Sequence, residues 1–250
     1  MKAAILIIGN EILSGRTQDV NIHFIADRLA LRGIPLAEVR IVRDEEDAVV
    51  NTVRALSETH DYVFSTGGIG PTHDDITAEC MAKAFNAPLE INEEAKRRLG
   101  EYYAAKFIGL SEGRLRMARI PVGATLIDNP VSGAPGFKIK NVFVMAGVPK
   151  IMQAMFLGIE STLARGVPML SNTITGSLRE SEIALEMEEI QKQHPDVEIG
   201  SYPAMGSEPS VSLVLRAVDE KKLKTATEKI VAMVKKLDAD AVITYQRPPK

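Results

Sequence analysis

The sequence predicts an α/β fold with a mostly parallel sheet and helices on both faces, followed by a smaller α+β domain. From residue 2 to about 165, short apolar runs alternate with segments of helical periodicity. This alternation is typical of a parallel sheet that helices cover on both sides. After residues 166–168 the expected order becomes strand, helix, strand, strand, helix, strand, the split βαβ arrangement of ferredoxin-like folds. We therefore expect one domain at residues 1–167 and a second at 168–250.

Each expected element of the first domain follows from local pattern. The near-continuous apolar run at residues 2–8 predicts a first strand, and Ile22, Ile25 and Leu29 recur at helical spacing before Gly33. The remaining expected elements are a strand at 36–42, a helix at 49–56, a strand at 61–66, a helix at about 74–85, a helix from the Asn92 cap to 107, strands at 124–127 and 141–146, and a helix at 149–163.

The second domain is read in the same way, from period-2 runs that alternate with helical stripes. Its expected elements are a strand at 171–178, a helix at 181–193, strands at 197–202 and 210–218, a helix at 220–237 and a strand at 241–245. Residues 166–168, Gly-Val-Pro, form the expected linker.

Composition excludes several classes of partner. The 30 basic and 33 acidic residues give a net charge of -3 without a long basic run, so nucleic acid is not an expected partner. No apolar stretch is long enough to cross a bilayer and the N-terminus lacks a signal sequence, so we expect a cytoplasmic protein without membrane contact. The lone Cys80 shares a helical stripe with apolar residues, which indicates a buried hydrophobe.

A glycine loop follows the third strand and is the strongest candidate for chemistry. Gly67, Gly68 and Gly70 permit positive φ angles that turn successive amides inward, and the next helix is expected to direct its positive end at the same place. Such a loop binds anions, but it also carries Asp74 and Asp75. We therefore expect a divalent metal, Mg, Mn or Co, to bridge these carboxylates and a bound phosphate, with both aspartates catalytic.

A second interpretation of the same segment is structural. Thr72 can cap the following helix, Asp75 can complete a capping box, and Asp74 can complement the helix dipole. Capping explains neither the three glycines nor Pro71, so the binding site is the preferred hypothesis. Thr66, Thr72 and His73 are then expected to contact the phosphate.

Three other loops are expected at the same edge of the sheet. Glu11 follows the first strand and can add a third carboxylate to the metal site, with a solvated glutamate as a close alternative. Further expected ligand contacts come from the Pro- and Gly-rich loop at 129–136 and from the turn after the last strand of the domain: Asn129, Ser132, Gly133, Pro135, Gly147 and Pro149.

Four motifs together resemble the CinA competence/damage-inducible family, whose N-terminal domain is of the molybdopterin-binding MoaB/Mog type. They are GNEILSG at 9–15, STGGIGPTHDDIT at 65–77, NPVSGAPGF at 129–137 and MAGVPKIMQAMF at 145–156. The family's ferredoxin-like part is similar to residues 170–246, including EIGSYPAMGSEPSVSLVLRA. The resemblance implies a homo-oligomer and either of two ligands, a dinucleotide pyrophosphate such as ADP-ribose or FAD, or a pterin phosphate such as molybdopterin.

The sequence also departs from the family pattern. Asn10 stands where the family usually has Asp or Thr, and Ile151 stands where its GVPxEM motif has Glu, which removes a carboxylate from the pocket rim. Many CinA proteins carry a C-terminal amidase domain, and with 250 residues we expect no amidase activity here.

Three functions remain open on these grounds. The preferred one is metal-dependent hydrolysis of a dinucleotide pyrophosphate, in which the metal activates water and the glycine-loop amides stabilise developing charge. The alternative is a protein that binds a nucleotide or pterin phosphate without turnover, which agrees with Ile151. A structural oligomerisation protein is the third, suggested by the apolar set Met145, Met152, Met155 and Phe156, although such spacing is more often core.

Overall fold

The computed structural model describes residues 1–203 and 210–246. The centre of the EIGSYPAMGSEPSVSLVLRA motif and the last four residues of the expected second domain lie outside these ranges. The chain divides into two compact units, Met1–Gly166 and Val167–Lys250, and each is considered by itself.

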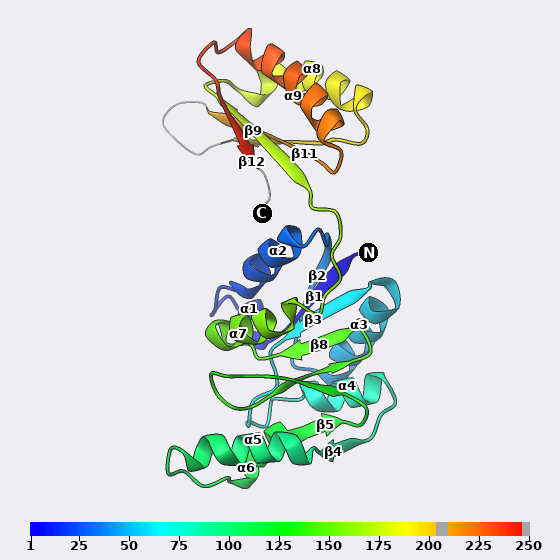
Figure 1. Cartoon of the computed structure of the whole chain (residues 1–250), viewed down its shortest axis with the longest axis vertical. Coiled ribbons are helices and arrows are strands. Elements are labelled where there is room, and N and C mark those ends of the chain that lie inside the picture. Colours follow the sequence, from blue (N-terminus) through cyan, green and yellow to red (C-terminus); the bar gives the residue numbers. More distant parts are fainter. Residues whose placement is uncertain (204–209, 247–250) are drawn as a thin grey trace. The chain divides into compact units, whose positions relative to one another are not determined.

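The first unit is built on a six-stranded sheet with the order β2-β1-β3-β8-β7-β6 (Figure 1). Its strands are β1 Ala3–Ile8, β2 Leu36–Val42, β3 Tyr62–Thr66, β6 Thr125–Ile127, β7 Gly136–Ile139 and β8 Val142–Met145. β1 pairs in parallel with β2 and β3, and β3 in parallel with β8, whereas β7 runs antiparallel to both of its neighbours. The predicted mostly parallel sheet is confirmed.

Two pairs of helices cover the faces of this sheet. α2 (Asn21–Leu31) and α7 (Pro149–Glu160) pack on one face, and α3 (Glu46–Thr59) and α4 (Thr77–Ala84) on the other. β1 contributes to both cores because alternate side chains of a strand point to opposite faces: Leu6 lies in the α3–α4 core and Ile5 in the α2–α7 core. This double burial explains why β1 is apolar without interruption.

A smaller lobe extends the α4 side of the sheet. It contains α5 (Glu93–Ala104), α6 (Glu112–Leu115), a 3-10 helix η1 (Arg116–Ala118) and a two-stranded antiparallel sheet of β4 (Leu89–Ile91) and β5 (Arg119–Pro121). The predicted Asn92 cap is confirmed, since its side chain accepts a hydrogen bond of 2.9 Å from the amide of Ala95. The short α1 (Asn10–Leu13), β4, β5, β7 and α6 were not predicted, because three or four residues carry too little periodicity.

The second unit has the predicted β-α-β-β-α-β order. Its elements are β9 Leu170–Gly176, α8 Glu180–Gln193, β10 Glu198–Pro203, β11 Val211–Ala217, α9 Glu220–Lys235 and β12 Val242–Gln246. The strands form an antiparallel sheet in the order β10-β11-β9-β12, and the helices pack against it through Ile183 and Ile230. This is the ferredoxin-like arrangement that the sequence predicts.

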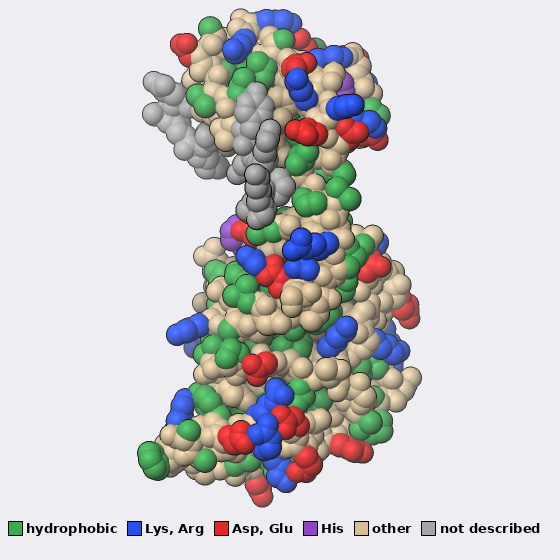
Figure 2. Space-filling view, in the orientation of Figure 1, with side chains coloured by type: hydrophobic (Ala, Val, Ile, Leu, Met, Phe, Trp, Pro, Cys, Tyr) green, Lys and Arg blue, Asp and Glu red, His purple; other side chains and the backbone are tan. Residues whose placement is uncertain are grey.

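Two further expectations concern the surface and Cys80. Over residues 1–203 and 210–246, no helix is long and apolar enough to cross a membrane. On the face of the first unit shown in Figure 2, acidic and basic side chains are interspersed. Cys80 is fully buried in the α3–α4 core, and this burial raises the pKa of its thiol to about 12. The prediction of a buried cysteine is therefore confirmed.

Candidate functional site

The glycine loop lies at the carboxyl edge of the sheet, between β3 and α4. Gly67 and Gly68 adopt φ angles of 102° and 66°, and a Cβ atom at either position would meet an oxygen at 2.1 Å (Ile8, backbone) or 2.2 Å (Thr77, Oγ1). Both positions therefore require glycine for two reasons, the left-handed backbone and the absence of space. The hydroxyl of Thr77 donates to the carbonyl of Gly67 at 2.9 Å and fixes the loop against the helix.

The side chain of Asp75 organises the rest of the loop. One carboxylate oxygen accepts from the amide of Gly70 at 2.7 Å, and the other accepts from the amide of Thr72 at 2.8 Å and lies 2.5 Å from its hydroxyl. Because both oxygens of Asp75 are hydrogen-bonded inside the loop, this side chain holds the loop in its conformation.

The expected start of the helix near Asp74 is wrong by about one turn, since α4 begins at Thr77. Residues 72–75 form a turn instead, in which the amide of Asp75 donates to the carbonyl of Thr72 at 3.4 Å. Thr72 is therefore not the helix cap, and its hydrogen bonds to Asp75 belong to the loop rather than to a capping box.

Asp74 and His73 project from the loop into solvent. Both are exposed, and Nδ1 of His73 lies 4.0 Å from a carboxylate oxygen of Asp74. The hydroxyl of Thr72, 2.5 Å from the same carboxylate, is the main reason why the pKa of Asp74 lies below its usual value. The lowered pKa favours the ionised form of Asp74, and the exposed carboxylate is open to an added ligand.

Two amides of the loop remain available to a ligand. Within the described part of the chain, the amides of Gly68 and Ile69 donate no hydrogen bond, whereas those of Gly67 and Gly70 donate to Met145 and Asp75. Adjacent amides after a left-handed residue form a concave donor pair that suits an anionic oxygen.

One hollow, with a volume of about 50 Å³, lies beside the loop on the α2–α7 face of the sheet. Five of the predicted site residues line it: Glu11, Thr66, Gly67, Gly147 and Pro149. Glu11 folds back over the backbone of Gly9, since a Cβ atom there would lie 2.6 Å from its carboxylate oxygens. A Cβ atom at Gly147 would lie 3.2 Å from the Cα atom of Gly67, so Gly147 lies close to Gly67 in the wall of this hollow.

A second hollow, of about 20 Å³, lies on the α4 side of the same loop. The predicted residues Gly68, Gly70, Asp75 and Pro135 line it, together with Arg116 and the ion pair of Arg119 and Glu79, whose Nη1 and Oε1 are 2.5 Å apart. The glycine loop therefore separates two hollows, one over each face of the sheet.

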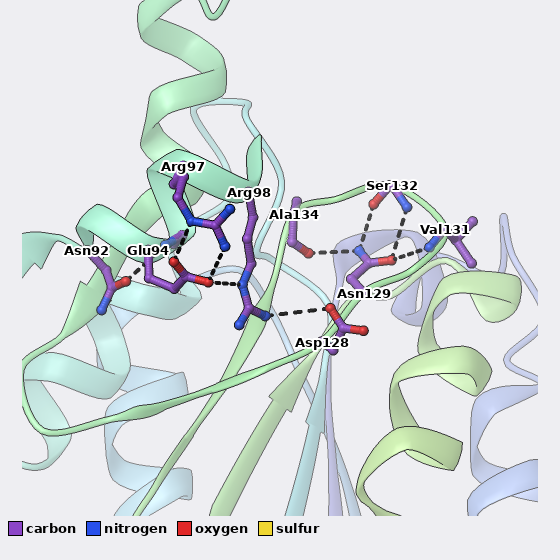
Figure 3. A network of polar contacts seen from close by, with 10 residues as sticks. Asn92, Glu94, Arg97, Arg98, Asp128, Asn129, Val131, Ser132 and Ala134 are labelled. Carbon is purple, nitrogen blue, oxygen red and sulfur yellow. Dashed lines mark hydrogen bonds and ion pairs between the residues drawn. The ribbon is translucent and has the colours of Figure 1, made fainter. Parts of the chain in front are cut away.

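The loop after β6 is held together by the buried side chain of Asn129 (Figure 3). Its Nδ2 donates to the hydroxyl of Ser132 and the carbonyl of Ala134, both at 2.7 Å, and its Oδ1 accepts from the amides of Val131 and Ser132, both at 3.1 Å. All four hydrogen bonds stay inside the loop, so the structure places Asn129 as its internal brace and not at a ligand-facing position.

The same loop is fixed from outside by α5. Gly133 adopts a φ of 71°, and a Cβ atom there would lie 2.5 Å from Tyr102, whose hydroxyl donates to the carbonyl of Val131. Arg98 connects Glu94 to Asp128, with nitrogen–oxygen distances of 2.8 and 3.5 Å (Figure 3). Gly133 is thus required for packing, and the loop forms a rigid boundary near the hollow that Pro135 lines.

The predicted metal ligands do not converge. Within the described ranges, no group of three or more His, Cys, Asp or Glu side chains is arranged to hold a metal ion. Glu11 and Asp75 line different hollows, and both oxygens of Asp75 are already engaged. The three carboxylates therefore do not form a metal site by themselves, although Glu11 and Asp74 are both exposed.

Sequence reasoning missed Asn21, Arg116 and Arg119. Asn21 is buried at the start of α2, donates from Nδ2 to the carbonyl of Gly147 at 2.8 Å, and has no hydrogen-bond partner for Oδ1 in the described structure. Its signal was available, because a polar residue four positions before Ile25 lies on the buried stripe of an amphipathic helix. The arginines belong to short elements without a period to detect.

Comparisons with known proteins agree with the motifs. Residues 4–165 match the family described as "Probable molybdopterin binding domain", and residues 168–243 match "FAD synthase, middle domain". A protein of Archaeoglobus fulgidus is 33% identical over 91% of this chain and 96% of its own length. A CinA-like protein of Sulfurihydrogenibium sp. is 40% identical, but the match covers 62% of this chain and only 40% of that protein.

A solved structure supports the same assignment for the first unit. The crystal structure of the protein CinA with unknown function from Thermoplasma acidophilum superposes with a TM-score of 0.60 at 36% identity, covering 64% of this chain and 96% of that one. The resemblance to CinA read from the four motifs is thereby confirmed. The chain belongs to the family of molybdopterin-binding-like domains found in CinA-like proteins, and a segment of the FAD synthase middle-domain type follows that domain.

Proposed function

We propose that this protein binds a diphosphate-bridged dinucleotide, such as ADP-ribose or FAD, with the diphosphate on the glycine loop. The observation that carries the proposal is the pair of unengaged amides at Gly68 and Ile69, held in place by a loop that Asp75 braces. Backbone amides in this arrangement provide donors for phosphate oxygens without a net charge on the loop.

The two hollows favour a dinucleotide over a pterin phosphate. In ADP-ribose and FAD the diphosphate lies between two bulky groups, whereas a pterin phosphate carries one such group. The loop has a hollow on each side, one with Glu11 and Asn21 and one with Arg116 and Arg119. Each hollow is small and would receive the part of the ligand nearest the phosphates. The match of residues 168–243 to the FAD synthase middle domain supports a nucleotide ligand.

Calorimetric titration of the whole chain tests this assignment. ADP-ribose and FAD are expected to bind at least about tenfold more tightly than AMP or a pterin phosphate, a difference of about 1.4 kcal/mol. Tighter binding of the pterin phosphate would instead establish the alternative ligand class. Gly68→Ala is expected to abolish binding, because its Cβ would contact Thr77.

Gly123→Ala is the matched control for that variant. Gly123 also has a positive φ, 85°, but a Cβ atom there would meet no other atom within 4 Å. Gly123→Ala therefore has a similar conformational cost in the backbone but does not change the glycine loop. The affinity of this variant for ADP-ribose is expected to equal that of the wild type. Equal losses in both variants would show that backbone strain, and not the loop, controls binding.

Asp74 supports a finer proposal, metal-dependent hydrolysis of the same ligand. Its ionised carboxylate is open to solvent in the same loop as the amides of Gly68 and Ile69, so it would share a divalent ion with the ligand's phosphates. A bound Mg, Mn or Co ion would supply charge neutralisation and an activated water. Glu11 lines the first hollow, whereas Asp74 does not line it, so the proposed ion is assigned to Asp74.

Release of AMP from ADP-ribose or FAD measures this activity. Turnover that requires metal, stops with a chelator and is lost in Asp74→Asn, while ADP-ribose still binds, would support hydrolysis. Tight binding without turnover in any metal would contradict it and leave a binding protein. That result would agree with the missing carboxylate at Ile151. This residue is half-buried against the α2–α7 core, at the position where the family motif has Glu.

A further inference from the structure

β2 is the edge strand of the six-stranded sheet, and its outer side is unpaired in the described part of the chain. The side chains of Val39 and Ile41, on the α2 side of the strand, are 38% and 37% exposed. An edge with apolar side chains is a surface on which another strand can pair, unless it is protected.

The backbone of β2 presents its free hydrogen-bonding groups at defined residues. The carbonyl of Val42 accepts from the amide of Gly9, which follows β1, so Val42 directs its backbone toward β1. Because residues of a strand alternate between the two neighbours, Arg40 also faces β1 and the amides and carbonyls of Val39 and Ile41 face outward.

The sequence of this edge is complementary to itself. In an antiparallel pairing of two β2 strands centred on Val39, Glu38 of one copy lies opposite Arg40 of the other, and the reverse pair follows by symmetry. The two Val39 residues face each other as a hydrogen-bonded pair through their outward backbone groups. We propose that this edge joins two copies of the chain into a dimer with a continuous twelve-stranded sheet, twice the six strands of one copy.

The positions of Glu38 and Arg40 allow these side chains to pair between two copies of the chain as well as within one. Glu38 and Arg40 lie on the same face of the sheet, where they are the register partners of Ala4 and Leu6 of β1. Within one chain, Oε1 of Glu38 and Nε of Arg40 are 2.6 Å apart. Their side chains are 36% and 40% exposed, respectively, beside a hollow that they line with Lys2. Cross-strand pairs of opposite charge stabilise antiparallel strands, so two such pairs would fix both the direction and the register.

Charge-reversal variants test whether the dimer uses this interface rather than another. Sedimentation of the whole chain over a range of concentrations is expected to show a dimer, and Glu38→Arg or Arg40→Glu to raise its dissociation constant by roughly tenfold or more, because like charges then face each other twice. An equimolar mixture of the two variants is expected to associate again, since one presents two cations and the other two anions along the same edge. The double variant is expected to dimerise like the wild type.

Val39→Pro provides a second test that leaves the charges unchanged. Proline is tolerated on an edge strand where the missing amide faces solvent, so the variant is expected to melt like the wild type but to remain monomeric. A wild-type chain that stays monomeric at every concentration would overturn the proposal. An oligomer that ignores both the charge reversals and Val39→Pro would overturn it equally, because it must use another surface.

Discussion

The carboxylate of Asp75 lies 2.7 Å from the amide nitrogen of Gly70 and closes the glycine loop on itself. Through this contact Asp75, which the sequence suggests as a metal ligand, braces the glycine loop. Its neighbour Asp74 is exposed and, in the described structure, accepts only from the hydroxyl of Thr72, so the two adjacent aspartates have different roles.

Asp75→Ala is expected to disorder the loop, because the amides of Gly70 and Thr72 lose their acceptor. The cost is expected to be about 2 kcal/mol in the free energy of unfolding, together with loss of ADP-ribose binding. Urea denaturation and calorimetry measure the two effects. Asp74→Ala, which removes an exposed carboxylate from the same turn, is the control and is expected to leave stability within about 0.5 kcal/mol. Equal destabilisation by both variants would refute the distinction.

Asn129→Ala is expected to destabilise the first unit by about 2–3 kcal/mol, since the four hydrogen bonds of this buried side chain are lost. Asn51→Ala, on the exposed face of α3, makes the same chemical change and is expected to have little effect. The urea midpoints of the two variants provide the comparison, and similar midpoints would show that Asn129 does not brace the loop.

The pKa of His194 is lowered, first because the ring is partly buried and second because Lys229 is near, and its Nε2 has no hydrogen-bond partner in the described structure. The folded chain therefore favours the neutral ring, and the unfolded chain binds the proton more tightly. The unfolding free energy is expected to decrease as pH falls below about 6.5. Proton NMR titration checks the pKa, and a value above 6.5 would reverse the expected direction.

Cys80 provides an independent measure of opening in the first unit. Because its thiol has a pKa of about 12 in the folded chain, alkylation at neutral pH is expected only when the α3–α4 core opens, and its rate should rise with urea in parallel with unfolding. Above about pH 8.5, where an unfolded thiol ionises, the unfolding free energy is expected to decrease. Cys80→Ala should remove that part of the pH dependence. Rapid alkylation of the native chain would contradict the buried position.

The sequence predicted the long elements well because each carries a full hydrophobic period. β2 lies at residues 36–42 as expected, and the ferredoxin-like order of the second unit follows from six clear runs. The start of α4 was misplaced because Thr72 and Asp75 have the spacing of a capping box, and only the fold shows that their hydrogen bonds close a turn.

The location of the candidate site could be predicted from the sequence, but the separate roles of its residues could not. Gly67 and Gly68 require glycine for steric reasons that the motif indicated. The inward role of Asn129 and the distribution of Glu11 and Asp75 between two hollows depend on contacts between distant segments, which one sequence does not encode in any local pattern.

The measurement that tests the central claim most directly is an amide NMR titration of the whole chain with ADP-ribose. If the diphosphate binds the glycine loop, the largest changes in chemical shift are expected at the amides of Gly68 and Ile69, the two unengaged donors. Smaller changes should follow at Asn21 and Arg119 in the two hollows. Binding that leaves Gly68 and Ile69 unchanged while other amides shift would contradict the assignment of the site.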